Sequence, residues 1–293
     1  APHILWPLRF VMPHDPSMRP AWLIRLGLFL YDHLARREVL PGSQGIDLRQ
    51  HVAGAPLKAR YTRGFVYSDG WVDDARLVVL NALAAKELGA DIRTRTACVS
   101  ARRENGLWKA QLKDEASGKI SEVTSRALVN AAGPWVNDVV GRVAGQNSSH
   151  SVRLVKGSHI VVPKFWEGPQ AYLVQNSDKR VIFINPYQND LALIGTTDIP
   201  YEGRAEDVAA DESEVDYLIN AVNRYFKPKL QRGDVLHSFS GVRPLFDDNA
   251  DNPSAVTRDY EFEVDAPTEG APLLSVFGGK ITTFRKLSEH AMD

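Results

Sequence analysis

The most informative segment of the sequence is Leu-Leu-Ser-Val-Phe-Gly-Gly-Lys-Ile-Thr-Thr-Phe-Arg, at residues 273–285. An apolar run typical of a buried strand leads into two glycines, and a helix is predicted over 282–290. Glycine lets a ligand approach the backbone closely, and a helix start offers N–H groups with a partial positive charge. Lys280 adds a full charge, so the segment suits an anionic or electron-accepting ligand; a purely structural turn is the alternative. The residues predicted to contact such a ligand are Gly278, Gly279, Lys280, Thr282 and Thr283.

A second candidate turn is Asn-Ala-Ala-Gly-Pro-Trp at residues 130–135. A short apolar run ends there in small residues, and α/β folds bind ligands where a strand ends before a helix. Gly133 and Trp135 are therefore candidate ligand contacts, although a packing turn would have the same composition.

Composition excludes several classes of protein. The chain has 293 residues with 35 basic and 36 acidic side chains, which gives a formal net charge of -1. Binding of nucleic acid through an overall positive charge is therefore not expected. Cys98 is the single cysteine, which rules out an intrachain disulfide and a cysteine-rich zinc site. The histidines show no metal-binding spacing, so no metal is predicted. No stretch approaches the ~20 apolar residues of a membrane span.

The order of elements predicts two interleaved domains. The helix predicted over 74–88 is rich in Ala, Leu and Val, as expected for a helix buried against a sheet. Together with the strands that follow, an Asn105-Gly106 hairpin and a short apolar strand, it is typical of an α/β nucleotide-binding domain. From about residue 150 the pattern changes to strands with one amphipathic helix, whose start carries Asp211 and Glu214 at capping-box spacing. This is an antiparallel α+β domain. The strand and helix predicted at 273–290 are again typical of the α/β nucleotide-binding domain.

Three cationic side chains and one histidine are candidates for chemistry. Arg243, Arg258 and Lys280 lie near predicted strand ends, and arginines suit phosphate because their hydrogen bonds are forked. For any one of them taken singly, a surface or ion-pair role is the more common explanation. His159 borders an apolar strand and is either a general base or a hydrogen-bonded core histidine.

The chain resembles the FAD-dependent, respiratory glycerol-3-phosphate dehydrogenases of the bacterial aerobic type. The resemblance covers essentially the whole length, in order, and rests on many short runs. These runs are Arg19–Trp22, Gly27–His33, Tyr67–Asp69, Trp71–Leu77, Ala101–Trp108, Lys156–Val162, Gly195–Asp198, Ser240–Leu245, Thr257–Tyr260 and Val276–Arg285.

That resemblance implies the fold of the amino-acid-oxidase group, α/β plus α+β. A partial FAD-binding domain would occupy 64–134 and 258–293, and an antiparallel-sheet substrate cap would occupy 1–63 and 135–257. It also implies oxidation of sn-glycerol 3-phosphate to dihydroxyacetone phosphate, with hydride passing to FAD and electrons to quinone.

Residue roles follow from the same resemblance. Arg243, Arg258 and Lys280 match basic positions around the substrate, and His159 matches a histidine near its hydroxyl; His159 and Lys280 are the catalytic candidates. The two glycine turns at Gly133–Trp135 and 278–283 match those beside the flavin.

One departure from the family is that the chain contains no Gly-x-Gly, the turn that holds the FAD pyrophosphate. We therefore expect an internal fragment that lacks the N-terminal glycine segment and the C-terminal helical domain. Alone, it is expected to bind FAD weakly or not at all and to be inactive. A related flavin amine or amino-acid oxidase and a non-catalytic binding module remain alternatives.

Membrane contact follows only from the expected quinone. The apolar helix predicted at 21–35, flanked by arginines, is the candidate for peripheral contact, although packing on its own domain explains it too. The expected location is the cytoplasm, at the inner face of the cell membrane, and a homodimer is left open.

Overall fold

The computed structural model describes residues 3–34, 36–247 and 259–293. It divides into two compact units. Unit 1 comprises residues 1–78, 157–197 and 209–240, and unit 2 comprises residues 79–156, 198–208 and 241–293. The units alternate along the chain, as interleaved domains do; the domain boundaries expected from the sequence stay predictions.

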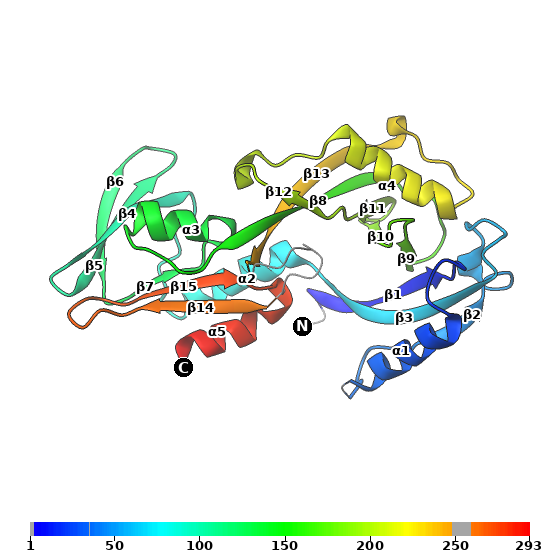
Figure 1. Cartoon of the computed structure of the whole chain (residues 1–293), viewed down its shortest axis with the longest axis horizontal. Helices are drawn as coiled ribbons and strands as arrows, with labels where there is room; N and C mark the ends of the chain where they lie inside the picture. The colour runs from blue at the N-terminus through cyan, green and yellow to red at the C-terminus, as the bar shows by residue number, and fades with distance from the viewer. Residues whose placement is uncertain (1–2, 35, 248–258) are drawn as a thin grey trace. The chain divides into compact units, whose positions relative to one another are not determined.

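Unit 1 is built on a large, mainly antiparallel sheet (Figure 1). Its order is β12-β8-β11-β10-β9-β1-β3-β2, with β13 also pairing with β8. Within this sheet, β1 and β9 pair in parallel. The strands are β1 Leu5–Pro13, β2 Gln44–Asp47, β3 Arg63–Val72, β8 Val152–Pro163, β9 Ala171–Gln175, β10 Val181–Tyr187, β11 Leu191–Gly195, β12 Ile199–Tyr201 and β13 His237–Phe246. Strands β8 and β13 continue into unit 2, to which β12 belongs.

Helix α4, Glu212–Tyr225, covers one face of this sheet (Figure 1). Its predicted capping box is present: the Asp211 side chain accepts from the Glu214 N–H, and the Glu214 side chain accepts from the Asp211 N–H. Leu218 and Val222 are fully buried against β-strand residues such as Ile160. The amphipathic periodicity read from the sequence therefore predicted both the helix and its buried face correctly.

Two helices are less buried than their composition suggests. Helix α1, Ala21–His33, and helix α2, Asp74–Glu87, contain no buried residue. The expectation that α2 is buried against a sheet is wrong for the described residues, because side chains such as Val79 and Leu83 are about half exposed. Helix α1 is held to its unit by polar contacts instead, including hydrogen bonds that the Ser43 N–H and hydroxyl donate to the Asp32 carboxylate.

Unit 2 contains two small sheets (Figure 1). Strands β4 Thr96–Glu104, β5 Leu107–Asp114 and β6 Ile120–Ser125 form an antiparallel meander, and β7 Leu128–Asn130, β15 Leu273–Gly278 and β14 Tyr260–Asp265 form a mixed sheet. The β4–β5 turn is the predicted hairpin, with φ of 51° at Asn105 and 75° at Gly106. Short helical segments follow β7: α3 Val136–Asp138 and the π-helix Val139–Val143. Helix α5, Phe284–Met292, follows β15.

Trp108 joins these two sheets. Its side chain is fully buried, its indole N–H donates to the Pro272 carbonyl at 2.9 Å, and the Arg103 guanidinium lies 4.5 Å from its ring centre. Arg103 also pairs with Asp265 at 2.8 Å. The meander is therefore fixed to the β14–β15 hairpin by burial, cation–π attraction and an ion pair together.

Candidate functional site

The parallel pairing of β7 with β15 creates the candidate site in unit 2. Leu273, Leu274 and Ser275 lie opposite Leu128, Val129 and Asn130. Both strands therefore end at the same edge of the sheet, and the two turns singled out in the sequence leave from that edge. This is where open α/β sheets bind ligands.

The turn after β15 has the backbone that its glycines require. Gly278 and Gly279 have φ of 79° and 95°, in the left-handed region that only glycine adopts at low cost. A Cβ on Gly278 would lie 2.6 Å from the Asp259 carbonyl oxygen, so the residue is also needed for close backbone packing.

A helix start follows this turn directly. Lys280 is exposed and precedes the 3₁₀ turn Ile281–Thr283, which continues into α5. The Thr283 hydroxyl donates to the Lys280 carbonyl at 3.0 Å and accepts from its N–H at 3.4 Å. Thr282 is exposed. A cationic side chain and the positive end of a helix therefore lie at one strand end, as the sequence predicted.

The turn after β7 is fixed by a buried asparagine that sequence reasoning did not select. Asn130 is 3% exposed; its side-chain amide donates to the Val136 carbonyl at 2.9 Å, and its carbonyl oxygen accepts from the Ala132 N–H at 3.3 Å. Gly133 has φ of 56°, and a Cβ there would meet no atom within 4 Å. The space beside Gly133 is open to a ligand.

Trp135 is half exposed, and its indole makes a polar contact. Its indole N–H donates to Glu206 at 3.0 Å. Hydrogen bonds from Arg204, from the Glu206 backbone and from Trp135 lower the pKa of the Glu206 carboxyl to about 2. The charged carboxylate is therefore present at neutral pH and anchors the indole at the turn.

Arg243 also belongs to unit 2. Its guanidinium pairs with Asp198 at 2.8 Å, and the two side chains are 37% and 20% exposed. Three residues further along β13, the Phe246 N–H lies 3.3 Å from the Cβ position of Gly278, so this strand ends beside the glycine turn. Arg258 lies outside the described residues.

His159 lies on β8 in unit 1 and is described within that unit. It is opposite Gly195 in β11, and its ring stacks on Phe239 with centroids 5.2 Å apart and planes 11° apart. A Cβ on Gly195 would lie 2.1 Å from Cδ2 of His159, so the imidazole can occupy this position only because residue 195 has no side chain.

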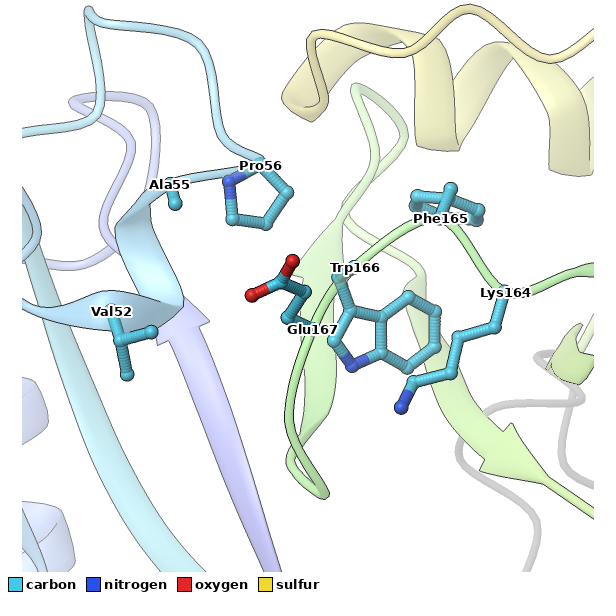
Figure 2. Close-up of a pocket in the computed structure, with 7 residues that line it drawn as sticks. All are labelled: Val52, Ala55, Pro56, Lys164, Phe165, Trp166 and Glu167. Atoms are coloured by element: carbon cyan, nitrogen blue, oxygen red, sulfur yellow. The ribbon is translucent and has the colours of Figure 1, made fainter. Parts of the chain in front are cut away.

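A hollow of about 380 Å³ lies elsewhere in unit 1 (Figure 2). It is lined by Val52, Ala55, Pro56, Lys164, Phe165, Trp166 and Glu167. The Lys164 ammonium lies 5.3 Å from the Trp166 ring centre and donates to the Gly168 carbonyl at 2.6 Å. The ammonium group is therefore bound by residues of its own loop. None of the described residues predicted for the site lines this hollow.

Comparison with known protein families decides the class of the chain. A family model described as FAD dependent oxidoreductase matches residues 1–285. The chain belongs to this family. The predicted fold class is thereby confirmed, and FAD is confirmed as the cofactor of the family.

Individual relatives confirm the resemblance seen in the sequence. The chain is 68% identical to D-erythritol 1-phosphate dehydrogenase of Brucella abortus, with 100% of this chain and 58% of the relative covered. It is 54% identical to glycerol-3-phosphate dehydrogenase of Pseudomonas aeruginosa, covering 100% and 56%. The structure of glycerol-3-phosphate dehydrogenase from Bacillus halodurans complexed with FAD superposes with a TM-score of 0.76 at 25% identity, covering 100% and 52%. The chain thus spans little more than half the length of these relatives.

The residues at the β7–β15 edge fit one part of a flavin cofactor. The open space at Gly133, the positive φ of the glycines and the helix start after Lys280 suit a planar group that gains electron density. The described residues that would hold it are Gly133, Trp135, Gly278, Gly279, Lys280, Thr282 and Thr283.

Proposed function

We propose that this chain supplies most of the active site of an FAD-dependent dehydrogenase that oxidises a short polyol phosphate. The observation that carries the proposal is the parallel register of β7 and β15, which brings the two predicted flavin-side turns to one edge. Family membership and the two named polyol-phosphate dehydrogenases support the substrate class.

Each candidate residue has a role that its chemistry allows. FAD supplies the hydride acceptor when it is bound. Lys280 and the helix start stabilise negative charge at the turn. Arg243, which pairs with Asp198, binds the substrate phosphate, because a guanidinium matches the geometry of phosphate oxygens. His159 takes the proton from the reacting hydroxyl. Arg258 is proposed as a second phosphate ligand on the resemblance alone.

Two substrates fit this proposal. Glycerol 3-phosphate is the one implied by the sequence resemblance, and the 54% identical relative is named for it. D-erythritol 1-phosphate is the second candidate, favoured by the higher identity of 68% to the dehydrogenase named for that substrate. The four-carbon compound carries one more hydroxyl, and a site built to hydrogen-bond that group would discriminate strongly against the shorter one.

The test uses the protein that contains this chain, purified and loaded with FAD. Each substrate is added without oxygen, and the visible flavin absorbance is followed. We expect bleaching with at least one of the two, and the ratio of their kcat/KM values assigns the substrate. If dithionite bleaches the flavin absorbance but neither polyol phosphate does, the proposal is refuted. Bleaching by an amino acid would favour the oxidase alternative.

We further propose that electrons pass to a membrane quinone and that α1 contacts the membrane surface from the cytoplasmic side. Trp22, Leu26 and Leu30 are 69%, 47% and 57% exposed, and exposed arginines lie beside them at positions 19, 25 and 36. Apolar side chains with flanking cations are typical of helices that lie in a membrane interface. No helix in the described ranges is long and apolar enough to cross a membrane.

Vesicle pelleting tests this contact. A variant with Leu26→Asp and Leu30→Asp should lose binding to anionic vesicles and keep its folded spectrum, because neither side chain is buried. A variant with Val52→Asp, another exposed position of unit 1, is the matched control. Equal vesicle binding by all three proteins would contradict the assignment of α1.

A further inference from the structure

A buried carboxylate lies at the start of α4, on a residue to which no role in binding substrate or cofactor was assigned above. Glu214 is 1% exposed. Its Oε1 accepts from the Ser158 and Thr197 hydroxyls, both at 2.7 Å, and its Oε2 accepts from the Asp211 N–H at 3.1 Å. A charge buried this deeply is tolerated only when hydrogen bonds compensate the lost water.

The protons of this cluster can be placed from its chemistry. A serine or threonine hydroxyl has one proton to donate. Since Ser158 gives its proton to Glu214, the 2.6 Å contact between Ser158 and Ser240 has Ser240 as the donor. The Ser158 N–H donates to the Thr197 hydroxyl at 2.8 Å. One carboxylate therefore orients three hydroxyls from three separate segments of unit 1.

Capping of α4 does not account for this arrangement. The capping box needs Oε2 of Glu214 and the Asp211 backbone, and it would form equally well on the surface. The two hydroxyls on Oε1 add nothing to the helix. What they fix is the position of the segments from which they come.

Those segments carry the candidate chemistry. Ser158 directly precedes His159, and Ser240 directly follows Phe239, which stacks on the His159 ring. Thr197 directly precedes Asp198, the ion-pair partner of Arg243. Glu214 therefore accepts hydrogen bonds from the residue next to His159 and from the residue next to Asp198, the carboxylate that pairs with Arg243.

We propose that Glu214 is a positioning residue that holds the His159 imidazole and the segment leading to Asp198 in their working geometry. This inference rests on the proposed function for its kinetic consequence. Reactive groups need placement to within a fraction of an ångström, and a misplacement of about 1 Å costs on the order of 100-fold in rate.

The central variant is Glu214→Gln in the full-length, FAD-loaded protein. An amide has one oxygen and one NH₂ group, whereas both carboxylate oxygens accept hydrogen bonds here. In the variant, the NH₂ group therefore faces hydrogen-bond donors, which are either the two hydroxyls or the Asp211 N–H. The shape of the side chain is kept. Thr197→Val, which removes one hydroxyl and keeps the carboxylate, is the second variant and tests the same point if Glu214→Gln does not fold.

Two controls separate positioning from stability. Glu212→Gln changes a carboxylate in the same first turn of α4 that is 86% exposed and pairs with Arg232. Leu218→Ala removes a fully buried side chain from the same helix without touching the cluster, and it lowers thermal stability.

We expect Glu214→Gln to lower kcat at 25 °C by about 10-fold or more, with a smaller change in KM, and to shift the pH profile of kcat. Both controls should stay within about 2-fold of the unmodified protein, although Leu218→Ala melts earlier. A kcat for Glu214→Gln no lower than that of Leu218→Ala would overturn the proposal.

A second readout does not depend on the substrate. The imidazole ¹H–¹⁵N signals of His159, assigned by their loss in His159→Gln, should shift in Glu214→Gln and not in the two controls. Unchanged signals would overturn the positioning role even if the protein oxidises no polyol phosphate. Absence of activity in the unmodified protein together with shifted signals would instead refute the proposed function and leave the positioning role supported.

Discussion

Gly195 gives the clearest test of the His159 assignment, because its missing side chain is what makes room for the imidazole. A Cβ added there would lie 2.1 Å from Cδ2 and 2.6 Å from Nε2 of His159. Carbon atoms pack at about 3.5 Å or more, so the ring must move by more than about 1 Å. Phe239, stacked on the ring, restricts the movement to directions away from its present position.

The size of the effect follows from that displacement. A shift of about 1 Å in a reacting group costs on the order of 100-fold in kcat, equivalent to about 2.7 kcal/mol of activation free energy. We expect this loss in Gly195→Ala, measured by steady-state oxidation of glycerol 3-phosphate and D-erythritol 1-phosphate. Gly45→Ala, in the same sheet with no atom within 4 Å of its Cβ position, is the matched control. A kcat for Gly195→Ala within about 2-fold of that control would refute the role of His159.

Three further predictions concern stability. Asn130→Ala should lower the free energy of unfolding by about 1–3 kcal/mol, because two backbone groups of the turn lose their partner; an unchanged urea midpoint would contradict this. Asp211→Ala should cost about 1 kcal/mol through loss of the α4 cap, measured in the same way, and a cost near zero would show that the cap is dispensable. Burial acts to raise the pKa of Glu263, but hydrogen bonds from Ser148 and Ser149 outweigh it, so the folded-state pKa lies below the ordinary 4.5. The carboxylate therefore stabilises the fold above pH 4.5, and this contribution is lost as pH falls through the folded-state pKa. Glu263→Gln should thus be less stable than the unmodified protein at pH 7, with a gap that narrows below pH 4.5 in chemical denaturation; a gap independent of pH would contradict it.

Features determined by neighbouring residues were predictable from the sequence. The α4 capping box and the Asn105-Gly106 hairpin each depend on a few adjacent positions whose conformational preferences agree. The turn at Gly278 and Gly279 belongs to the same class, because left-handed φ values select glycine regardless of the rest of the chain.

Features that join distant segments were not predictable in this way. Nothing within 128–130 specifies β15 as its parallel neighbour, and the resemblance to a family, not periodicity, indicated that the two turns belong together. The buried face of α2 was predicted wrongly, since an apolar composition states a preference and does not provide the surface that would satisfy it. Glu214 was recognised as a capping residue, but its burial depends on Ser158 and Thr197, which no local pattern connects to it.

The two glycine turns at the β7–β15 edge show how one residue type answers two different physical demands. At Gly278 the demand comes from within the protein, since a side chain would collide with the Asp259 carbonyl oxygen at 2.6 Å. At Gly133 no atom of the described residues lies within 4 Å of the Cβ position, and glycine is favoured there by the positive φ of 56°. A glycine that packing requires maintains the strand-to-helix turn, whereas a glycine beside open space leaves the backbone accessible. The first therefore sets the geometry of the edge, and the second leaves the backbone accessible at the position where we propose that the ligand binds.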